Sequence, residues 1–223
     1  MHYLLGSLLL LAIWLLIFIS QKKLRKEMLI ASLIVTPAAL SEVFFVPGYW
    51  LPDTIGNPKL SIEDFIFTFA VGGIVAVIYE LFMKGRVKHQ RLCDCFNGGI
   101  FHGLLLGTGV IAIFLTYTIF KINFMYAVYI GIIINIALIA VTRPDLIKKV
   151  IYSGLLFGLF YFLFFSIFAF FIPDFIMHWN INNLSGLIIL GVPLEEIVWA
   201  FGVGALLGPI YEYLLGIKLT VRR

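Results

Sequence analysis

Charge is scarce in this 223-residue sequence, in which only 13% of the residues are Asp, Glu, Lys or Arg. Ordinary globular chains are about 25% charged and 45 to 50% apolar. Here 62% of the residues are apolar, and the mean hydropathy is +1.07. So few charged residues cannot form a water-facing surface around so apolar an interior. Disordered chains have low hydrophobicity and high charge, which is the opposite composition. The composition therefore predicts a membrane protein with several spans, and the length indicates a single domain.

Cysteine is almost absent as well. Cys93 and Cys95 are too few for a disulfide framework or a cysteine-based zinc site. No Gly-x-Gly-x-x-Gly motif follows a strand-like segment, so a dinucleotide-binding fold is not predicted. We therefore expect neither a cofactor nor a structural metal.

The sequence contains many apolar runs that are long enough to span a membrane. About 20 apolar residues cross the ~30 Å hydrocarbon layer as a helix, and seven runs qualify. The last has 33 residues, about 50 Å as one helix, so we expect Gly191 and Pro193 to break it. The seven runs cover residues 3–20, 28–45, 62–83, 98–120, 123–141, 147–172 and 184–216.

The basic residues are distributed very unequally between the two sides of the predicted membrane. Only Lys59 and Lys121 fall on one side, and the other fourteen fall on the opposite side. The positive-inside rule then predicts an external amino terminus and a cytoplasmic carboxyl terminus. These bases are expected to lie against anionic lipid headgroups, so membrane lipids are predicted partners and nucleic acid is not. The fourteen are Lys22, Lys23, Arg25, Lys26, Lys84, Arg86, Lys88, Arg91, Arg143, Lys148, Lys149, Lys218, Arg222 and Arg223.

The sequence also contains an internal repeat. Residues 62–80 match residues 194–212 at a constant offset of 132, and residues 44–47 match 170–173 at an offset of 126. This pattern predicts a duplicated three-helix unit, with copies at 1–84 and 122–223 joined by a basic loop and connector helix at 85–121. One connecting span would make the copies parallel, with the functional site between them.

Acidic residues recur at equivalent positions of the two copies. Carboxylates inside a membrane are costly and usually face the protein interior or a cavity, so they are candidates for function. Glu42, near the outer end of the second span, is a candidate for substrate binding. The predicted catalytic residues are Glu63, Asp64, Glu195 and Glu196.

Helix capping is the alternative explanation for these acidic pairs. Ser61 followed by an acid three residues later fits a capping box, and Pro193 suits the first turn of a helix. In that interpretation both pairs only cap helices at the outer surface. The apolar segment before Glu195 instead indicates a position below the surface. For Glu80 and Glu212, at the cytoplasmic helix ends, solvated or packing roles are expected, with Lys84 or Lys218 nearby.

Convergence of the four acids in an aromatic pocket would permit proton transfer. Buried and mutually repelling carboxyls would not all be ionised, so one can donate a proton while a neighbour accepts one. Aromatic faces can stabilise a passing carbocation through the ring quadrupole. Phe67, Trp199 and Phe201, which lie on the same predicted helices as the acids, are therefore candidates for substrate binding.

The duplicated unit resembles the lycopene cyclase domain of the heterodimeric and fused carotenoid cyclases. The residues that carry this resemblance are Pro193-Leu-Glu-Glu196 in one copy and Ser61-Ile-Glu-Asp64 in the other. Ser61 departs from the family, which has Pro at this position. The resemblance implies a prokaryotic cytoplasmic-membrane isomerase of the lycopene beta-cyclase kind, with a lipid-soluble polyene substrate. It also implies association with other enzymes of carotenoid biosynthesis.

Other functions remain open from the sequence. A proton-coupled small-molecule transporter could be built from parallel three-helix repeats, although the spans offer only scattered polar residues for a path. A retinal-binding receptor is not expected, because the last span has no lysine before Lys218. A membrane scaffold, or a cyclase-like protein with another substrate, is the third alternative.

Overall fold

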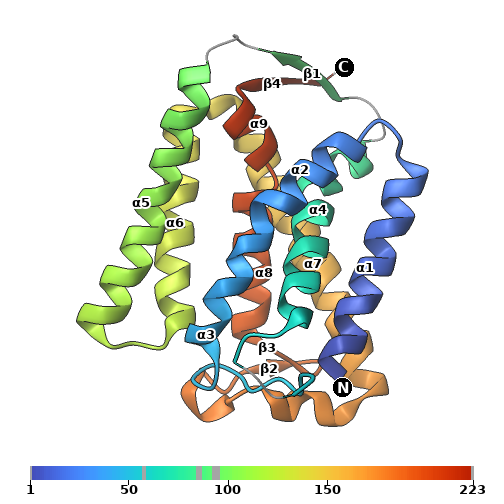
Figure 1. The fold of residues 1–223 in the computed structure, drawn as a ribbon, viewed down its shortest axis with the longest axis vertical. Helices are drawn as coiled ribbons and strands as arrows, with labels where there is room; N and C mark the ends of the chain where they lie inside the picture. Colours follow the sequence, from blue (N-terminus) through green and yellow to red (C-terminus); the bar gives the residue numbers. More distant parts are fainter. Residues whose placement is uncertain (1, 57–58, 84–86, 92–95, 222–223) are drawn as a thin grey trace.

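The computed structural model describes residues 2–56, 59–83, 87–91 and 96–221, and helices dominate it (Figure 1). The α-helices are α1 His2–Ser20, α2 Arg25–Val35, α3 Glu42–Phe45, α4 Ile62–Met83, α5 Phe96–Phe120, α6 Phe124–Thr142, α7 Ile147–Phe171, α8 Leu194–Leu207 and α9 Ile210–Leu215. Short 3-10 helices occur at η1 Thr36–Ser41, η2 Pro144–Leu146, η3 Pro173–His178 and η4 Ile181–Asn183. The strands are β1 Val87–Arg91, β2 Ile188–Ile189, β3 Val192–Pro193 and β4 Ile217–Val221.

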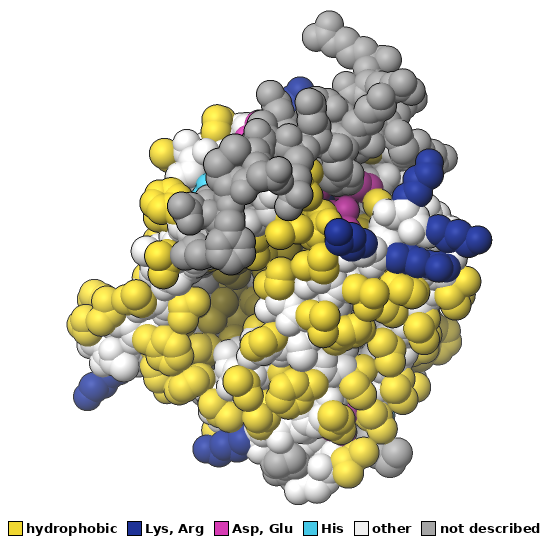
Figure 2. Space-filling view, turned by 45° about the horizontal axis from the view of Figure 1, so that its top comes forward, with side chains coloured by type: hydrophobic (Ala, Val, Ile, Leu, Met, Phe, Trp, Pro, Cys, Tyr) yellow, Lys and Arg dark blue, Asp and Glu magenta, His cyan; other side chains and the backbone are white. Residues whose placement is uncertain are grey.

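The described residues contain seven helical segments that are long and apolar enough to cross a membrane, as the sequence predicted. Their mean hydropathy ranges from 1.4 to 2.5. The side chains they leave exposed are also apolar, and Leu16, Val141 and Phe170 are 68%, 80% and 78% exposed. Figure 2 shows that hydrophobic side chains cover most of the described surface in that view. Such a surface suits contact with lipid better than contact with water.

The helices pack around α4, α7 and α8. α1 and α2 lie against α4, α7 lies along α8, and α5 pairs with α6, which also contacts α8. In Figure 1, α1, α4 and α8 begin at the lower end of the bundle, whereas α2 and α7 begin at the upper end. "Lower end" and "upper end" are used in this sense below.

Two short antiparallel pairs add strands to the predicted all-α architecture. At the upper end β1 pairs with β4, and both strands lie outside the predicted spans. At the lower end β2 pairs with β3 in a tight turn, in which Leu190 and Gly191 have positive φ angles of 47° and 81°. α8 begins directly after Pro193, so the predicted break of the last apolar run is confirmed.

Small residues allow the central helices to approach closely. A Cβ atom built on Gly204 of α8 would lie 2.7 Å from the Ser153 carbonyl oxygen and 2.8 Å from Phe157 Cβ, both on α7. Close backbone approach of this kind stabilises helix pairs in membranes through van der Waals contact.

We expect Gly204→Val to force α7 and α8 apart and to lower the free energy of unfolding by about 1–3 kcal/mol. Thermal unfolding of the purified protein in detergent measures this. Gly107→Val is the matched control, since a Cβ on Gly107 of α5 has nothing within 4 Å. Equal losses in the two variants would contradict the packing argument.

Candidate active site

The four predicted catalytic carboxyls lie at the lower end, in the first turns of α4 and α8. All of them are buried, with exposures of 0% for Glu63, 2% for Asp64, 4% for Glu195 and 7% for Glu196. Neither pair is a solvent-exposed cap. The first turn of a helix suits these acids, because the unpaired N–H groups at a helix N-terminus interact favourably with nearby carboxylates.

Glu196 accepts hydrogen bonds from three ring-bearing side chains. Its Oε1 accepts from the Tyr49 hydroxyl at 2.8 Å and from Trp179 Nε1 at 2.9 Å, and its Oε2 accepts from the Tyr161 hydroxyl at 2.9 Å. Tyr161 comes from α7, whereas Tyr49 and Trp179 come from the loops after α3 and η3. Burial and the Glu196 carboxyl raise the pKa of Tyr49 well above its ordinary value, so this phenol remains a donor. The three donors would stabilise a negative charge on Glu196, against the cost of burying that charge.

Asp64 has an equally rich set of donors. Tyr3 of α1 donates its hydroxyl to Oδ1 at 2.8 Å, while the Ser61 N–H and hydroxyl donate to Oδ2 at 2.6 and 2.9 Å. The bond from the Ser61 N–H is half of the predicted capping box. Asp64 therefore caps its helix and is also buried within the site. Helix capping and a position below the surface, the two alternatives from the sequence, both apply to it.

Glu42 of α3 lies close enough to both of these carboxyls to interact with them. It interacts electrostatically with both Asp64 and Glu196, and Trp50 Nε1 donates a hydrogen bond to it. Three carboxylates this close would repel one another in a poorly solvated site. One of the three is therefore expected to carry a proton.

The first acid of each pair binds a loop instead. The Ile55 N–H donates to Glu63 at 3.0 Å, and the Ser185 N–H donates to Glu195 at 2.6 Å. Glu195 also accepts from the Tyr126 hydroxyl at 3.1 Å. These bonds hold the loops that precede α4 and α8 against the helix starts.

Aromatic rings lie one turn further along the helices. Phe67 and Trp199, at corresponding positions of the predicted repeats, stack with centroids 6.3 Å apart. The Tyr161 ring is 6.5 Å from Phe67 and 5.4 Å from Trp199. Each stacked residue follows an acid by three positions, so ring and carboxyl share a helix face. Phe201 lies elsewhere, 42% exposed and against Gly154 and Gly158 of α7.

Several residues of this site were not predicted from the sequence. They come from four separate segments and share no spacing, so the sequence offered only a general enrichment in aromatic residues as a signal. These residues are Tyr3, Tyr49, Tyr161 and Trp179.

A second buried cluster lies at the upper end and corrects two expectations. Lys149 was counted with the basic residues at the lipid surface, but it is 1% exposed. Its Nζ donates to Glu27 at 3.1 Å and to Glu80 and Glu212 at 2.8 Å each. Solvated roles for Glu80 and Glu212 are therefore wrong, because their exposures are 6% and 0%. Helix packing encloses all four groups, and Lys149 accompanies these acids. The expected neighbour Lys84 and the side chain of Lys218 lie outside the described part of the structure.

The sequence of the second half of the chain is similar to that of a family of known proteins. Residues 123–214 match the family model described as lycopene cyclase. The resemblance inferred from the sequence is thereby confirmed for this segment. No curated protein and no solved structure matches the chain.

The lycopene cyclase match contains one complete acidic pair with its surroundings. It runs from the start of α6 into α9 and includes Glu195, Glu196, Tyr161, Trp179 and Trp199. Residues 1–122 lie outside the match, so Asp64 and Glu63 are linked to lycopene cyclases only through the predicted repeat. The match supports a carotenoid cyclase family and does not favour the transporter alternative.

Proposed function

We propose that this protein is a carotenoid cyclase, an isomerase that closes the end group of a linear, lycopene-type polyene by acid catalysis. The observation that carries the proposal is the Glu196 carboxyl, which is buried among aromatic donors inside the segment that matches lycopene cyclases. The substrate is hydrophobic, and the mostly apolar surface of the helices suits delivery from a membrane.

The reaction needs an acid and a base in one poorly solvated site. A proton adds to the terminal double bond of the polyene, the tertiary cation is attacked by a double bond further along the chain, and a carboxylate removes a proton from the new ring. One proton is gained and one is lost, so the product is an isomer of the substrate. No step changes the oxidation state.

Hydrogen bonding suggests which carboxyl plays which part. Glu196 and Asp64 each accept three hydrogen bonds from neutral donors, which would stabilise a negative charge on them better than a single donor could. Glu42 has the Trp50 N–H as its donor and lies in the field of both. In this proposal Glu42 holds the proton that starts the reaction, and Glu196 accepts the ring proton.

Phe67, Tyr161 and Trp199 have a separate task in the proposal. Their ring faces would stabilise the positive charge while it moves along the substrate, as cation–π contacts do for ligand cations. Phe201 is less suited to this task, because its side chain is 42% exposed at the outside of the bundle. Glu63 and Glu195 position the loops around the site.

The membrane arrangement belongs to the same proposal. The chain would cross a prokaryotic cytoplasmic membrane seven times, with the lower end outside and the upper end in the cytoplasm. The two three-helix repeats would lie parallel, with the cyclase site between them. The enzyme would contact lipids and associate with other carotenoid-pathway enzymes.

Expression in a lycopene-accumulating bacterium tests the proposed reaction. We expect lycopene to be replaced by a cyclic product of the same mass, separable by chromatography and recognised by its absorption spectrum. Immunodetection in the membrane fraction shows that the protein is present. Unchanged lycopene in cells that contain the protein would contradict the proposed substrate.

A further inference from the structure

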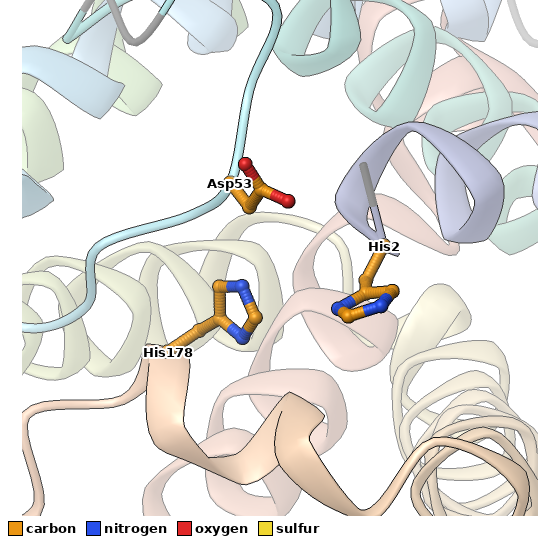
Figure 3. A group of neighbouring side chains, drawn as sticks. All are labelled: His2, Asp53 and His178. Carbon is orange, nitrogen blue, oxygen red and sulfur yellow. The ribbon is translucent and has the colours of Figure 1, made fainter.

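A second group of potential ligands lies at the lower end, beside the carboxylate site. His2 of α1, Asp53 of the loop after α3 and His178 of η3 each offer a ligand atom, and these three atoms lie within 4.8 Å of one another. Figure 3 shows the three side chains arranged around a common space. Residues distant in the sequence thus meet at one point.

Hydrogen bonds hold the elements that carry Asp53 and His178 together. The Leu51 N–H donates to the His178 carbonyl at 2.6 Å, and the Asn180 N–H donates to the Tyr49 carbonyl at 2.9 Å. Trp50 and Trp179 form an antiparallel bridge between the same segments. Two of the three ligands are therefore brought together by backbone pairing.

Both histidines have a ring nitrogen that could bind a metal. The His178 Nδ1 lies 2.9 Å from the Phe175 carbonyl oxygen. A carbonyl can only accept, so the neutral ring carries its proton on Nδ1 and presents the lone pair of Nε2. The rings of His2 and His178 are 5.8 Å apart. The Nδ1 of His2 is buried and has no hydrogen-bond partner among the described residues.

We propose that His2, Asp53 and His178 form a binding site for a zinc ion. Two imidazoles and one carboxylate are a common ligand set for zinc, and water can occupy the fourth position. Tetrahedral binding with bonds of about 2.0–2.1 Å requires ligand atoms about 3.4 Å apart. The three ligand atoms lie within 4.8 Å of one another, so side-chain rotations would have to shorten their separations by at most about 1.4 Å.

The zinc site would control the shape of the proposed active site. His2 precedes Tyr3, which donates to Asp64, and His178 precedes Trp179, which donates to Glu196. Asp53 lies two residues before Ile55, whose N–H donates to Glu63. Each zinc ligand thus lies within two residues of a donor to a different carboxyl, so a bound ion would restrain all three donors. This effect on activity rests on the proposed cyclase function, whereas zinc binding itself does not.

Zinc binding to the full chain in detergent tests the site. The protein is prepared without a histidine tag, stripped with a chelator and titrated with ZnCl₂, using calorimetry and metal analysis. We expect about one zinc ion per chain and a higher thermal unfolding temperature with Zn²⁺ than without it. MgCl₂ should have no such effect, because magnesium prefers oxygen ligands.

Variants identify the ligands, and each is compared with its own zinc-free form. His2→Gln, Asp53→Asn and His178→Gln should each weaken zinc binding by at least about tenfold and abolish the thermal shift. Asp174→Asn is the matched control, because Asp174 is an exposed acid on the same η3 helix. Absence of stoichiometric binding to the unchanged chain, or equal binding to all variants, would overturn the proposal. Zinc binding without cyclase activity would leave the site valid and contradict only the proposed function.

Discussion

Glu196→Gln is expected to reduce cyclase activity by at least about 100-fold, the lower range for loss of a general base. The amide has nearly the shape of the carboxyl but cannot accept the ring proton. Its oxygen can still accept hydrogen bonds, whereas its NH₂ group would face a former donor such as Tyr161. Conversion of lycopene to a cyclic isomer, normalised to the amount of membrane protein, gives the activity.

Glu195→Gln is the matched comparison for this prediction. The same substitution at the neighbouring position removes a carboxylate that binds the Ser185 N–H and Tyr126, at the edge of the site. We expect a loss of roughly tenfold, because a loop is displaced while the base remains. A larger loss in Glu195→Gln than in Glu196→Gln would show that the roles of the two acids are reversed.

The long helices could be predicted from the sequence because membrane spans depend on local composition. Seven apolar runs led to seven helical segments of sufficient length, and the break before Leu194 followed from the excess length of the last run. The strands were missed. β1 and β4 pair across more than 120 residues, and pairing at that separation leaves no periodic signal in either segment.

The acids of the site could be found from the sequence because carboxylates are energetically costly inside a membrane and because these recur at a constant offset of 132 residues. Their partners could not. Tyr49 and Trp179 reach Glu196 from two loops, which become neighbours only through the backbone bridge between Trp50 and Trp179. A loop tyrosine resembles any interfacial aromatic until the tertiary structure places it.

Lys149 shows most clearly where charge counting fails. It stands beside Lys148 in a basic segment, and the positive-inside rule treats both alike. Lys148 is exposed, whereas Lys149 turns inward on α7 and binds three glutamates. Adjacent helical residues differ in direction by about 100°, so the face of a helix decides between a lipid headgroup and a buried cluster.

Lys149→Met is expected to lower the free energy of unfolding by about 3–5 kcal/mol, because it removes the ammonium group that three buried carboxylates share. Met preserves much of the side-chain volume, so the change isolates the ammonium group. Glu27, Glu80 and Glu212 lie on α2, α4 and α9, and Lys149 therefore holds helices of both predicted repeats together. Thermal or denaturant unfolding in detergent measures the loss.

Lys148→Met on the same helix is the control, and it should change the free energy of unfolding by less than about 0.5 kcal/mol. The double variant Lys149→Met with Glu80→Gln should recover part of the loss, because one buried carboxylate is removed together with its partner. Equal destabilisation by the two single lysine variants would contradict the clustered arrangement. Glu80 of the cluster and Asp64 of the proposed site lie at opposite ends of α4, so cyclase activity per folded molecule should remain close to that of the unchanged protein.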